Sequence, residues 1–214
     1  LAYLRTSDVS QVETKIRDAW RHFFEGDPET QRLFYETADD MAYIADTGNQ
    51  DVRSEGMSYG MMIAVMLDEK EAFDKLWKWA KTHMHHASGG RKGYFAWHCD
   101  FDGNQLSDAS ASDGEEWFAM ALYFASGRWG NGAGIFNYQQ EADQLLHDML
   151  HKSDPKGYLK SIFHKDALQP VFVPHGIYGE FTDPSYHLPA FYTLWARWAP
   201  EDRDTWSKCT EISR

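Results

Sequence analysis

Cysteine is almost absent from the chain, with only Cys99 and Cys209 among 214 residues. Two thiols are too few for a disulfide framework, and they fit a reducing compartment or simple burial. The N-terminus from Leu1 onward also lacks the charged-then-apolar pattern of a secretory signal. We therefore expect a cytoplasmic protein rather than a secreted one, with removal of a signal peptide ahead of Leu1 as the alternative.

Positive charge is also scarce: 21 Lys and Arg residues face 33 Asp and Glu residues, which gives a net charge of −12. This balance repels phosphate backbones and anionic lipids, so we expect neither nucleic acid nor a membrane as a partner. No apolar run approaches the roughly 20 residues that span a bilayer, and the longest covers only 61–67. Neutral ligands are the class that remains.

Aromatic side chains, in contrast, are abundant, and Phe, Tyr and Trp make up 15% of the chain. Rings of this kind fill hydrophobic cores, but they also form the flat apolar platforms on which sugar faces stack. The composition is therefore compatible with a core of packed rings, with a sugar-binding site, or with both.

The hydrophobic periodicity is helical along most of the chain. Only 94–97 and 171–173 resemble strands, and no Pro-, Gly- or Ser-rich linker divides the sequence. We therefore predict one all-α domain without a sheet. Its expected helices cover 10–25, 54–67, 68–84, 113–126, 138–152, 189–198 and 200–213.

Glu55 is the first candidate for chemistry, because it lies at the start of the predicted 54–67 helix. A carboxylate is favoured there by the helix dipole alone, so an ordinary first-turn Glu is the alternative. Gly56 and Gly60, however, each cost roughly 0.8–1 kcal/mol in a helix relative to Ala. They suggest that something approaches this backbone closely, and Arg53 is near enough in sequence to hold or tune the Glu55 carboxyl.

Asp113 is the second candidate. It precedes an apolar helix and, with Glu116, matches a capping box. One side chain seldom both caps a helix and faces a ligand. Either Asp113 is the N-cap, or it faces a ligand and leaves capping and the helix dipole to Glu115 and Glu116.

Two loops offer further candidates. Pro184 and Pro189 fix a rigid turn that would hold Tyr186 and His187 in defined positions. Trp97 follows a glycine-bounded loop, where a tryptophan is either a ligand platform or part of the core.

A metal or cofactor is not expected. The three neighbouring histidines lack Cys or Glu partners at metal-site spacing and fit the C-terminal end of a helix. The chain also has no glycine-rich phosphate loop, dinucleotide fingerprint or serine nucleophile elbow. The histidines are His83, His85 and His86.

Four segments, in the same order along the chain, resemble the signature segments of glycoside hydrolase family 8. Residues 113–116 and 124–126 are most similar to the reducing-end xylose-releasing exo-oligoxylanases of that family. The resemblance extends from about Val12 to the end of the chain. The four segments are 51–62, 93–97, 113–130 and 181–189.

The resemblance implies an (α/α)6 toroid, in which six helical hairpins form a ring, and an inverting cleavage of β-1,4 bonds in xylo-oligosaccharides that releases xylose from the reducing end. By motif position, Glu55 matches the general acid and Asp113 the residue that positions the cleaved sugar. Tyr186 matches the tyrosine that helps to place the attacking water. Trp97 and Arg53 match substrate-binding residues.

Inversion also needs an ionised carboxylate roughly 6.5–9.5 Å from the acid, to activate water. In the resembling family this base lies on a later segment, so we expect no general base in this chain. We expect residues 1–214 to be the N-terminal part of one catalytic domain whose remainder follows Arg214. Asp183 is the one in-chain substitute, although its Asp-Pro context fits a helix cap better.

The acid must keep its proton near neutral pH. We therefore expect Glu55 to lie in an apolar setting or beside a second carboxylate such as Asp113, either of which raises a pKa. Two other functions are compatible with the residues: an endo-β-1,4-xylanase of the same family, and a non-catalytic carbohydrate-binding fragment.

Overall fold

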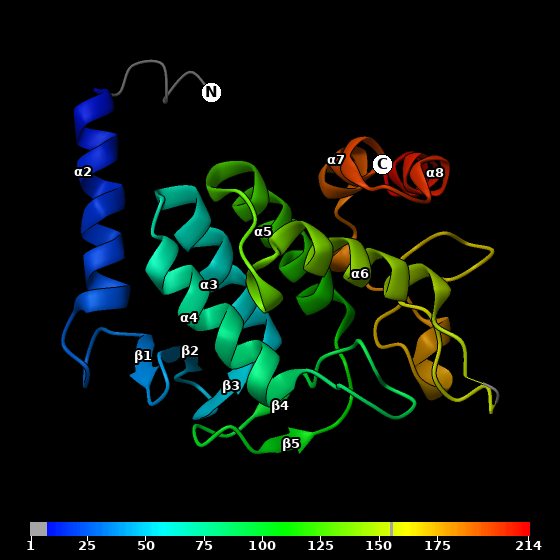
Figure 1. The fold of residues 1–214 in the computed structure, drawn as a ribbon, viewed down its shortest axis with the longest axis horizontal. Coiled ribbons are helices and arrows are strands. Elements are labelled where there is room, and N and C mark those ends of the chain that lie inside the picture. Colours follow the sequence, from blue (N-terminus) through cyan, green and yellow to red (C-terminus); the bar gives the residue numbers. More distant parts are fainter. Residues whose placement is uncertain (1–7, 155) are drawn as a thin grey trace.

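The computed structural model describes residues 8–154 and 156–214. Helical elements account for about half of the described chain, and seven of them are α-helices (Figure 1). They are α2 (Val9–Trp20), α3 (Ser54–Leu67), α4 (Lys70–Trp79), α5 (Ser112–Trp129), α6 (Tyr138–His151), α7 (Pro189–Trp198) and α8 (Arg203–Ile212). Two π-helical turns extend α2 and α4, namely η1 (Arg21–Glu25) and η2 (Ala80–Met84), and three 3-10 turns complete the helical elements: η3 (Gly134–Phe136), η4 (Gly176–Glu180) and η5 (Pro184–Tyr186).

Six of these helices form three consecutive helical hairpins: α3 with α4, α5 with α6, and α7 with α8. The first two hairpins join through α3 and α5, which pack against each other, and α2 stands at the outer side of α3 (Figure 1). The prediction of a predominantly helical chain is confirmed, and the observed bounds of α3 and α7 are the predicted ones.

In the α3–α4 and α5–α6 hairpins, the first helix is more deeply buried than the second. Helix α5 buries 12 of its 18 residues and α3 buries eight of 14, whereas α6 buries five of 14 and α4 four of 10. A helix that is apolar nearly all round needs neighbours on several sides, while an amphipathic one covers a single face. Helices α3 and α5 are therefore inner elements, and α4 and α6 form the outer layer.

Aromatic rings supply much of the core. Trp195 and Trp206 contact each other edge-to-face at 4.9 Å, and Phe163 packs against Trp206 at 5.0 Å. Rings in such edge-to-face pairs contribute about 0.5–1.5 kcal/mol beyond the area that they bury. Much of the aromatic content is thus structural, with four tryptophans almost completely buried: Trp77, Trp79, Trp195 and Trp206.

The prediction that the chain has no sheet is wrong. Five short strands form an antiparallel sheet in sequential order below the helices (Figure 1). Their lengths of two to six residues are too short for a clear alternation of polar and apolar side chains, which is the signal that identifies a strand. They are β1 (Phe34–Thr37), β2 (Met41–Asp46), β3 (Asp51–Arg53), β4 (His98–Cys99) and β5 (Gln105–Ser107).

The two segments that resembled strands also differ from expectation. In 94–97 only Phe95 pairs, through an isolated bridge to His85, and strand β4 begins one residue after this segment. The 171–173 segment forms no strand, and the nearby bridge joins Phe163 to Pro170. The sheet matters for the site because β3 runs directly into α3 and β4 follows Trp97 without a gap.

Two predicted helix starts are shifted. Asp8, not Ser10, caps α2 by accepting the backbone N–H of Ser10. Asp68 does not open the next helix but ends α3 in the left-handed conformation, with φ of 67°. Its carboxylate accepts the indole N–H of Trp129 at 2.7 Å, so this side chain joins two helix C-termini. Within the described residues, no helix has the length and apolar character needed to span a bilayer.

Candidate active site

The N-termini of the two inner helices meet at one place. Ser54 at the start of α3 lies directly against Gly114 of α5, where an added Cβ would be 2.5 Å from the Ser54 Oγ. Only glycine permits this approach, because real Cβ atoms do not come so close to a heavy atom. The contact places the neighbouring side chains, Glu55 and Asp113, beside each other.

The carboxyl groups of Glu55 and Asp113 lie within hydrogen-bonding reach of one another. Asp113 is only 4% exposed, and its Oδ1 has no hydrogen-bond partner among the described residues. Burial, and then the neighbouring Glu55, raise the pKa of Asp113 from 3.8 to about 7. The helix dipole, worth about 0.3–1 kcal/mol, opposes this shift and is outweighed. The Asp113 carboxyl is therefore partly protonated near neutral pH, beside the side chain of Glu55.

The interpretation of Asp113 as a helix cap is wrong. Helix α5 begins at Ser112 after Ala111, and no side chain caps it. Asp113 lies inside the helix, and its carboxyl group is close to Glu55. The ligand-facing alternative is the one that the geometry supports.

Tyr186 approaches the same pair from the turn that precedes α7. Burial, together with the charges of Asp113 and Glu55, raises the pKa of the Tyr186 phenol. The same three causes raise the pKa of Tyr59 on α3. Both phenols therefore stay protonated and can act as hydrogen-bond donors beside the two carboxyls. The Tyr186 ring is held by stacking on Phe172, with centroids 5.6 Å apart.

A cavity of about 320 Å³ opens over these groups. This volume is at the lower end of the range for small-ligand sites. Trp97 and Tyr186 form part of its wall, together with the exposed ring of Tyr178 on η4. The lining residues are Glu55, Trp97, Ala109, Ala111, Phe172, Val173, His175, Tyr178 and Tyr186.

Two backbone hydrogen bonds hold Trp97 in place. Its carbonyl accepts the N–H of Ser54 at 3.0 Å, and its own N–H donates to the carbonyl of Ala109 at 2.8 Å. The start of α3 and the segment before α5 thus hold the tryptophan at the mouth of the cavity. Its indole ring also stacks on His98, with centroids 4.5 Å apart.

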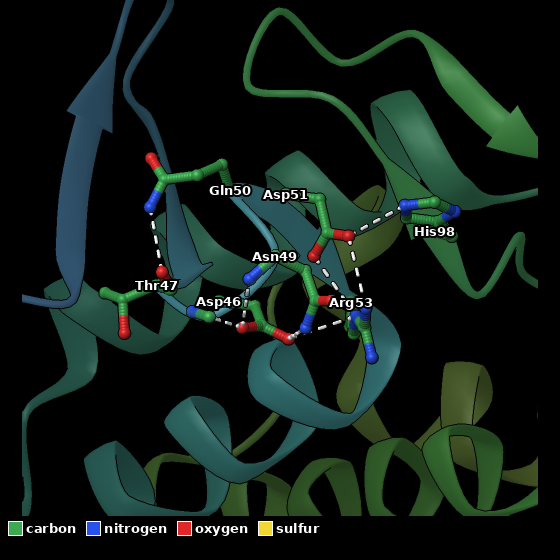
Figure 2. Close-up of polar contacts among 8 residues, drawn as sticks. Asp46, Thr47, Asn49, Gln50, Asp51, Arg53 and His98 are labelled. Atoms are coloured by element: carbon green, nitrogen blue, oxygen red, sulfur yellow. Dashed lines mark hydrogen bonds and ion pairs between the residues drawn. The ribbon is translucent and has the colours of Figure 1, made fainter.

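Arg53 does not hold Glu55 as the sequence suggested. Its Nε lies 3.1 Å from Asp46 Oδ2, at the end of β2, and 3.1 Å from Asp51 Oδ1, at the start of β3 (Figure 2). The guanidinium also lies over the ring of Trp97, 5.2 Å from its centroid. Its two short carboxylate contacts outweigh a longer-range attraction to Glu55. Arg53 therefore supports the tryptophan platform rather than the acid.

Asp51 and His98 complete this support, and no sequence pattern indicated their roles. His98 Nε2 lies 2.8 Å from Asp51 Oδ2, and the two residues sit on adjacent strands β3 and β4 (Figure 2). An antiparallel pairing of this kind cannot be found when the strands themselves are missed.

The remaining polar candidates have structural partners. His187 contacts Thr182 Oγ1 through Nε2 at 2.8 Å and Ser213 Oγ through Nδ1 at 3.0 Å. The Asp183 carboxylate accepts the N–H and the hydroxyl of Ser185, and these hydrogen bonds lower its pKa. Asp183 is therefore the cap of η5, as its Asp-Pro context indicated.

The close approach inferred from Gly56 and Gly60 has a different origin from a ligand. A Cβ at Gly60 would be 2.6 Å from Ile44 Cγ1, whereas one at Gly56 would make an ordinary 3.5 Å contact with the same side chain. Strand β2 is what packs against α3 here. Gly60 permits that packing, and Gly56 is not required for it.

The three neighbouring histidines each contact a different residue. The His83 ring packs on Trp79 and the His85 ring on Phe95, while His86 Nε2 contacts the carbonyl of Asp108. In the two described ranges, no group of three or more His, Cys, Asp or Glu side chains is placed to hold a metal ion.

Comparison with known proteins identifies the family. Residues 35–213 match Glycosyl hydrolases family 8. The chain is 47% identical over 205 residues to the reducing-end xylose-releasing exo-oligoxylanase Rex8A of Paenibacillus barcinonensis, an alignment that covers 95% of this chain and 53% of the relative. It is 45% identical over 207 residues to the corresponding enzyme of Halalkalibacterium halodurans, covering 96% and 52%. Endoglucanases are more distant, at 33% identity for endoglucanase A of Acetivibrio thermocellus, covering 77% and 32%.

The fold agrees with the sequence match. The structure of Rex8A from Paenibacillus barcinonensis complexed with xylose superimposes with a TM-score of 0.92 at 46% identity, covering 98% of this chain and 54% of the other. The chain thus spans about half the length of the relatives that it matches. Its three hairpins correspond to half of the six in an (α/α)6 toroid, and the chain belongs to glycoside hydrolase family 8.

Proposed function

We propose that the chain is the acid-bearing part of an inverting glycoside hydrolase that cleaves β-1,4-xylosidic bonds in xylo-oligosaccharides and releases xylose from the reducing end. The observation that carries the proposal is the close approach of the Glu55 and Asp113 side chains beside a cavity walled by Trp97 and Tyr186. The names of two relatives, at 47% and 45% identity, support the substrate and the exo mode.

In the proposed reaction, Glu55 donates its proton to the leaving glycosidic oxygen. Asp113 lies beside Glu55, so in this proposal it can accept a hydrogen bond from a hydroxyl of the sugar whose bond is cleaved. The protonated phenol of Tyr186 can donate a hydrogen bond to the attacking water. The carboxylate that activates this water in an inverting reaction belongs, in this proposal, to the rest of the catalytic domain.

The rest of that domain is also the proposed partner of an apolar groove between α2 and α3. The groove encloses about 820 Å³ and is lined mostly by carbon atoms. Large apolar side chains exposed in this way mark a surface that another element covers. Four of them are well exposed: Ile16, Phe23, Ile63 and Met66.

The test uses the protein that contains this chain together with the rest of its catalytic domain. We expect Glu55→Gln to fold normally and to lose at least about 100-fold in kcat on xylotriose, because the general acid is removed. Glu211→Gln, at an exposed site on α8, is the matched control and should keep wild-type activity. A Glu55→Gln variant with the wild-type rate would show that Glu55 is not the acid.

Product analysis separates the alternatives. Chromatography of the products from xylotriose and from polymeric xylan distinguishes single xylose release from internal cleavage, and internal cleavage would replace the exo assignment with an endo-xylanase. The alternative of a non-catalytic carbohydrate-binding fragment is tested by calorimetry of the 214-residue chain with xylo-oligosaccharides. A reducing-sugar assay of the complete enzyme is run beside it. Heat of binding without product from the complete enzyme would overturn the assignment as a hydrolase.

A further inference from the structure

Helix α5 begins with three buried carboxylic acids, and their side chains have different neighbours. Asp113 lies beside Glu55, whereas Glu115 and Glu116 are completely buried and contact other segments. Buried carboxyls are costly unless they are hydrogen-bonded, so their partners reveal what they hold in place.

Glu115 holds the segment that carries Trp97. Its Oε1 accepts the backbone N–H of Phe95 at 3.0 Å. The ring of Phe95 packs against Phe118 of the same helix, with centroids 5.0 Å apart. Trp97 is two residues further along, so its position relative to Asp113 depends on this attachment.

Glu116 holds the turn that carries Tyr186 through one intermediate side chain. The hydroxyl of Tyr192 donates to Glu116 Oε2 at 2.8 Å and accepts the backbone N–H of Leu188 at 2.9 Å. The same hydroxyl lies 3.2 Å from the carbonyl oxygen of Tyr186. Two polar groups of the turn thus meet a phenol that is fixed to the helix of Asp113.

Tyr192 is itself rigid, because its ring is completely buried and contacts three aromatic neighbours. These are Phe163 at 5.2 Å, Trp195 at 5.3 Å and Trp206 at 6.4 Å between centroids. A side chain packed on all sides transmits the position of α5 to the turn with little freedom to relax.

We propose that Glu115 and Glu116 are positioning residues, and that the start of α5 is a common anchor that sets Trp97 and Tyr186 against the Glu55–Asp113 pair. The inference rests on the proposed function for its kinetic consequence, but not for the anchoring itself. Neither glutamate reaches the cavity wall, so each acts through the residue that it holds.

The anchoring is tested without reference to activity by hydrogen–deuterium exchange of the complete enzyme. Glu116→Gln and Tyr192→Phe should accelerate amide exchange in peptides that cover 182–188, because the acceptor of the Leu188 N–H is displaced or lost. Glu115→Gln should act in the same way on peptides that cover 93–97. Tyr123→Phe is the matched control, since this phenol of α5 donates to Asp143 at 2.6 Å and does not line the cavity.

The kinetic readout distinguishes positioning from a general loss of folded protein. We expect Tyr192→Phe and Glu116→Gln to lower kcat on xylotriose by about 10- to 100-fold, the cost of misplacing a reacting group, with a smaller change in KM. Glu115→Gln should instead raise KM, because Trp97 binds rather than reacts. Thermal unfolding of each variant is measured in parallel, and Tyr192→Phe serves if Glu116→Gln does not fold.

The outcomes are separable. If Glu116→Gln and Tyr192→Phe change amide exchange in the 182–188 peptides and kcat no more than Tyr123→Phe does, the proposed anchor is wrong. If the wild-type enzyme does not hydrolyse xylo-oligosaccharides, the proposed function fails, while accelerated exchange in the 182–188 peptides would still support the anchor.

Discussion

Gly114 of α5 lies so close to Ser54 of α3 that a Cβ at residue 114 would be 2.5 Å from the serine hydroxyl and 2.7 Å from its Cβ. This single contact sets the separation of the two helix starts. Because Glu55 and Asp113 are the adjacent residues, the contact also determines how close their carboxyl groups lie.

We therefore expect Gly114→Ala to force the two helices apart and to destabilise the fold by about 1–3 kcal/mol, the usual cost of overpacking a core. Activity should fall by up to about 100-fold, because the carboxyl pair is displaced. Urea unfolding and xylotriose hydrolysis measure the two effects. Gly127→Ala on the same helix is the control: its Cβ would meet nothing within 4 Å, and it should stabilise by about 0.5–1 kcal/mol. Equal behaviour of the two variants would contradict the role given to Gly114.

The buried carboxyls predict that the fold is more stable in mild acid than at pH 8. Burial raises the pKa of Asp113 to about 7 and that of Glu115 to about 8. The folded state therefore binds protons that the unfolded chain, with ordinary values near 4, has already released. Stability is complete below about pH 4 for these groups and is lost as the pH rises through 7–8.

Between pH 5 and 7 each group should lower the free energy of unfolding by about 1.4 kcal/mol per pH unit. Urea titrations at several pH values measure this slope. Glu115→Gln keeps an acceptor for the Phe95 N–H but cannot ionise. The free energy of unfolding of this variant should therefore fall less steeply with pH, by the contribution of one carboxyl group. A slope identical to that of the wild type would mean that Glu115 is already ionised in the folded state.

Arg53 should affect sugar binding through Trp97. A lysine keeps the charge but not the planar guanidinium that lies over the indole and contacts two carboxylates. Loss of a cation–π contact costs about 0.5–2 kcal/mol, so Arg53→Lys should bind xylo-oligosaccharides about two- to 30-fold more weakly. Calorimetry measures the affinity. Arg21→Lys, at an exposed ion pair with Asp18, should bind as the wild type does, and the same result for Arg53→Lys would refute the platform role.

Asp183 should be dispensable for chemistry. Asn at this position keeps an oxygen for the Ser185 N–H and removes the charge, so Asp183→Asn should stay within about twofold of wild-type kcat, as surface changes usually do. A loss as large as that of Glu55→Gln on xylotriose would instead identify Asp183 as a base within this chain.

The helices could be predicted from the sequence because each is long enough to repeat its apolar period several times. The residues of α3 and α7 match their predicted bounds for this reason. The sheet could not be predicted, because its strands of two to six residues carry no repeated alternation. With the sheet unrecognised, the partners of Arg53 on β2 and β3 were also out of reach.

The start of α5 shows a second limit of sequence reasoning. Asp113 and Glu116 have the spacing of a capping box, yet neither caps the helix. Their roles depend on Glu55 and Tyr192, which lie far away in the sequence and approach only after α3 and α7 have packed. Local spacing identified the right residues, while tertiary contacts decided what each one does.

Glu55 lines both the small cavity beside Trp97 and Tyr186 and the broad apolar groove between α2 and α3. The element that occupies the groove therefore controls how much water reaches the Glu55 carboxyl from the groove side. If binding in the groove changes the affinity of the cavity for its ligand, binding in the cavity changes the affinity of the groove for its cover by the same factor. A substrate that favours the covered state would thus tighten the association of the groove with its cover, and the catalytic proton would be sheltered at the moment when it is needed.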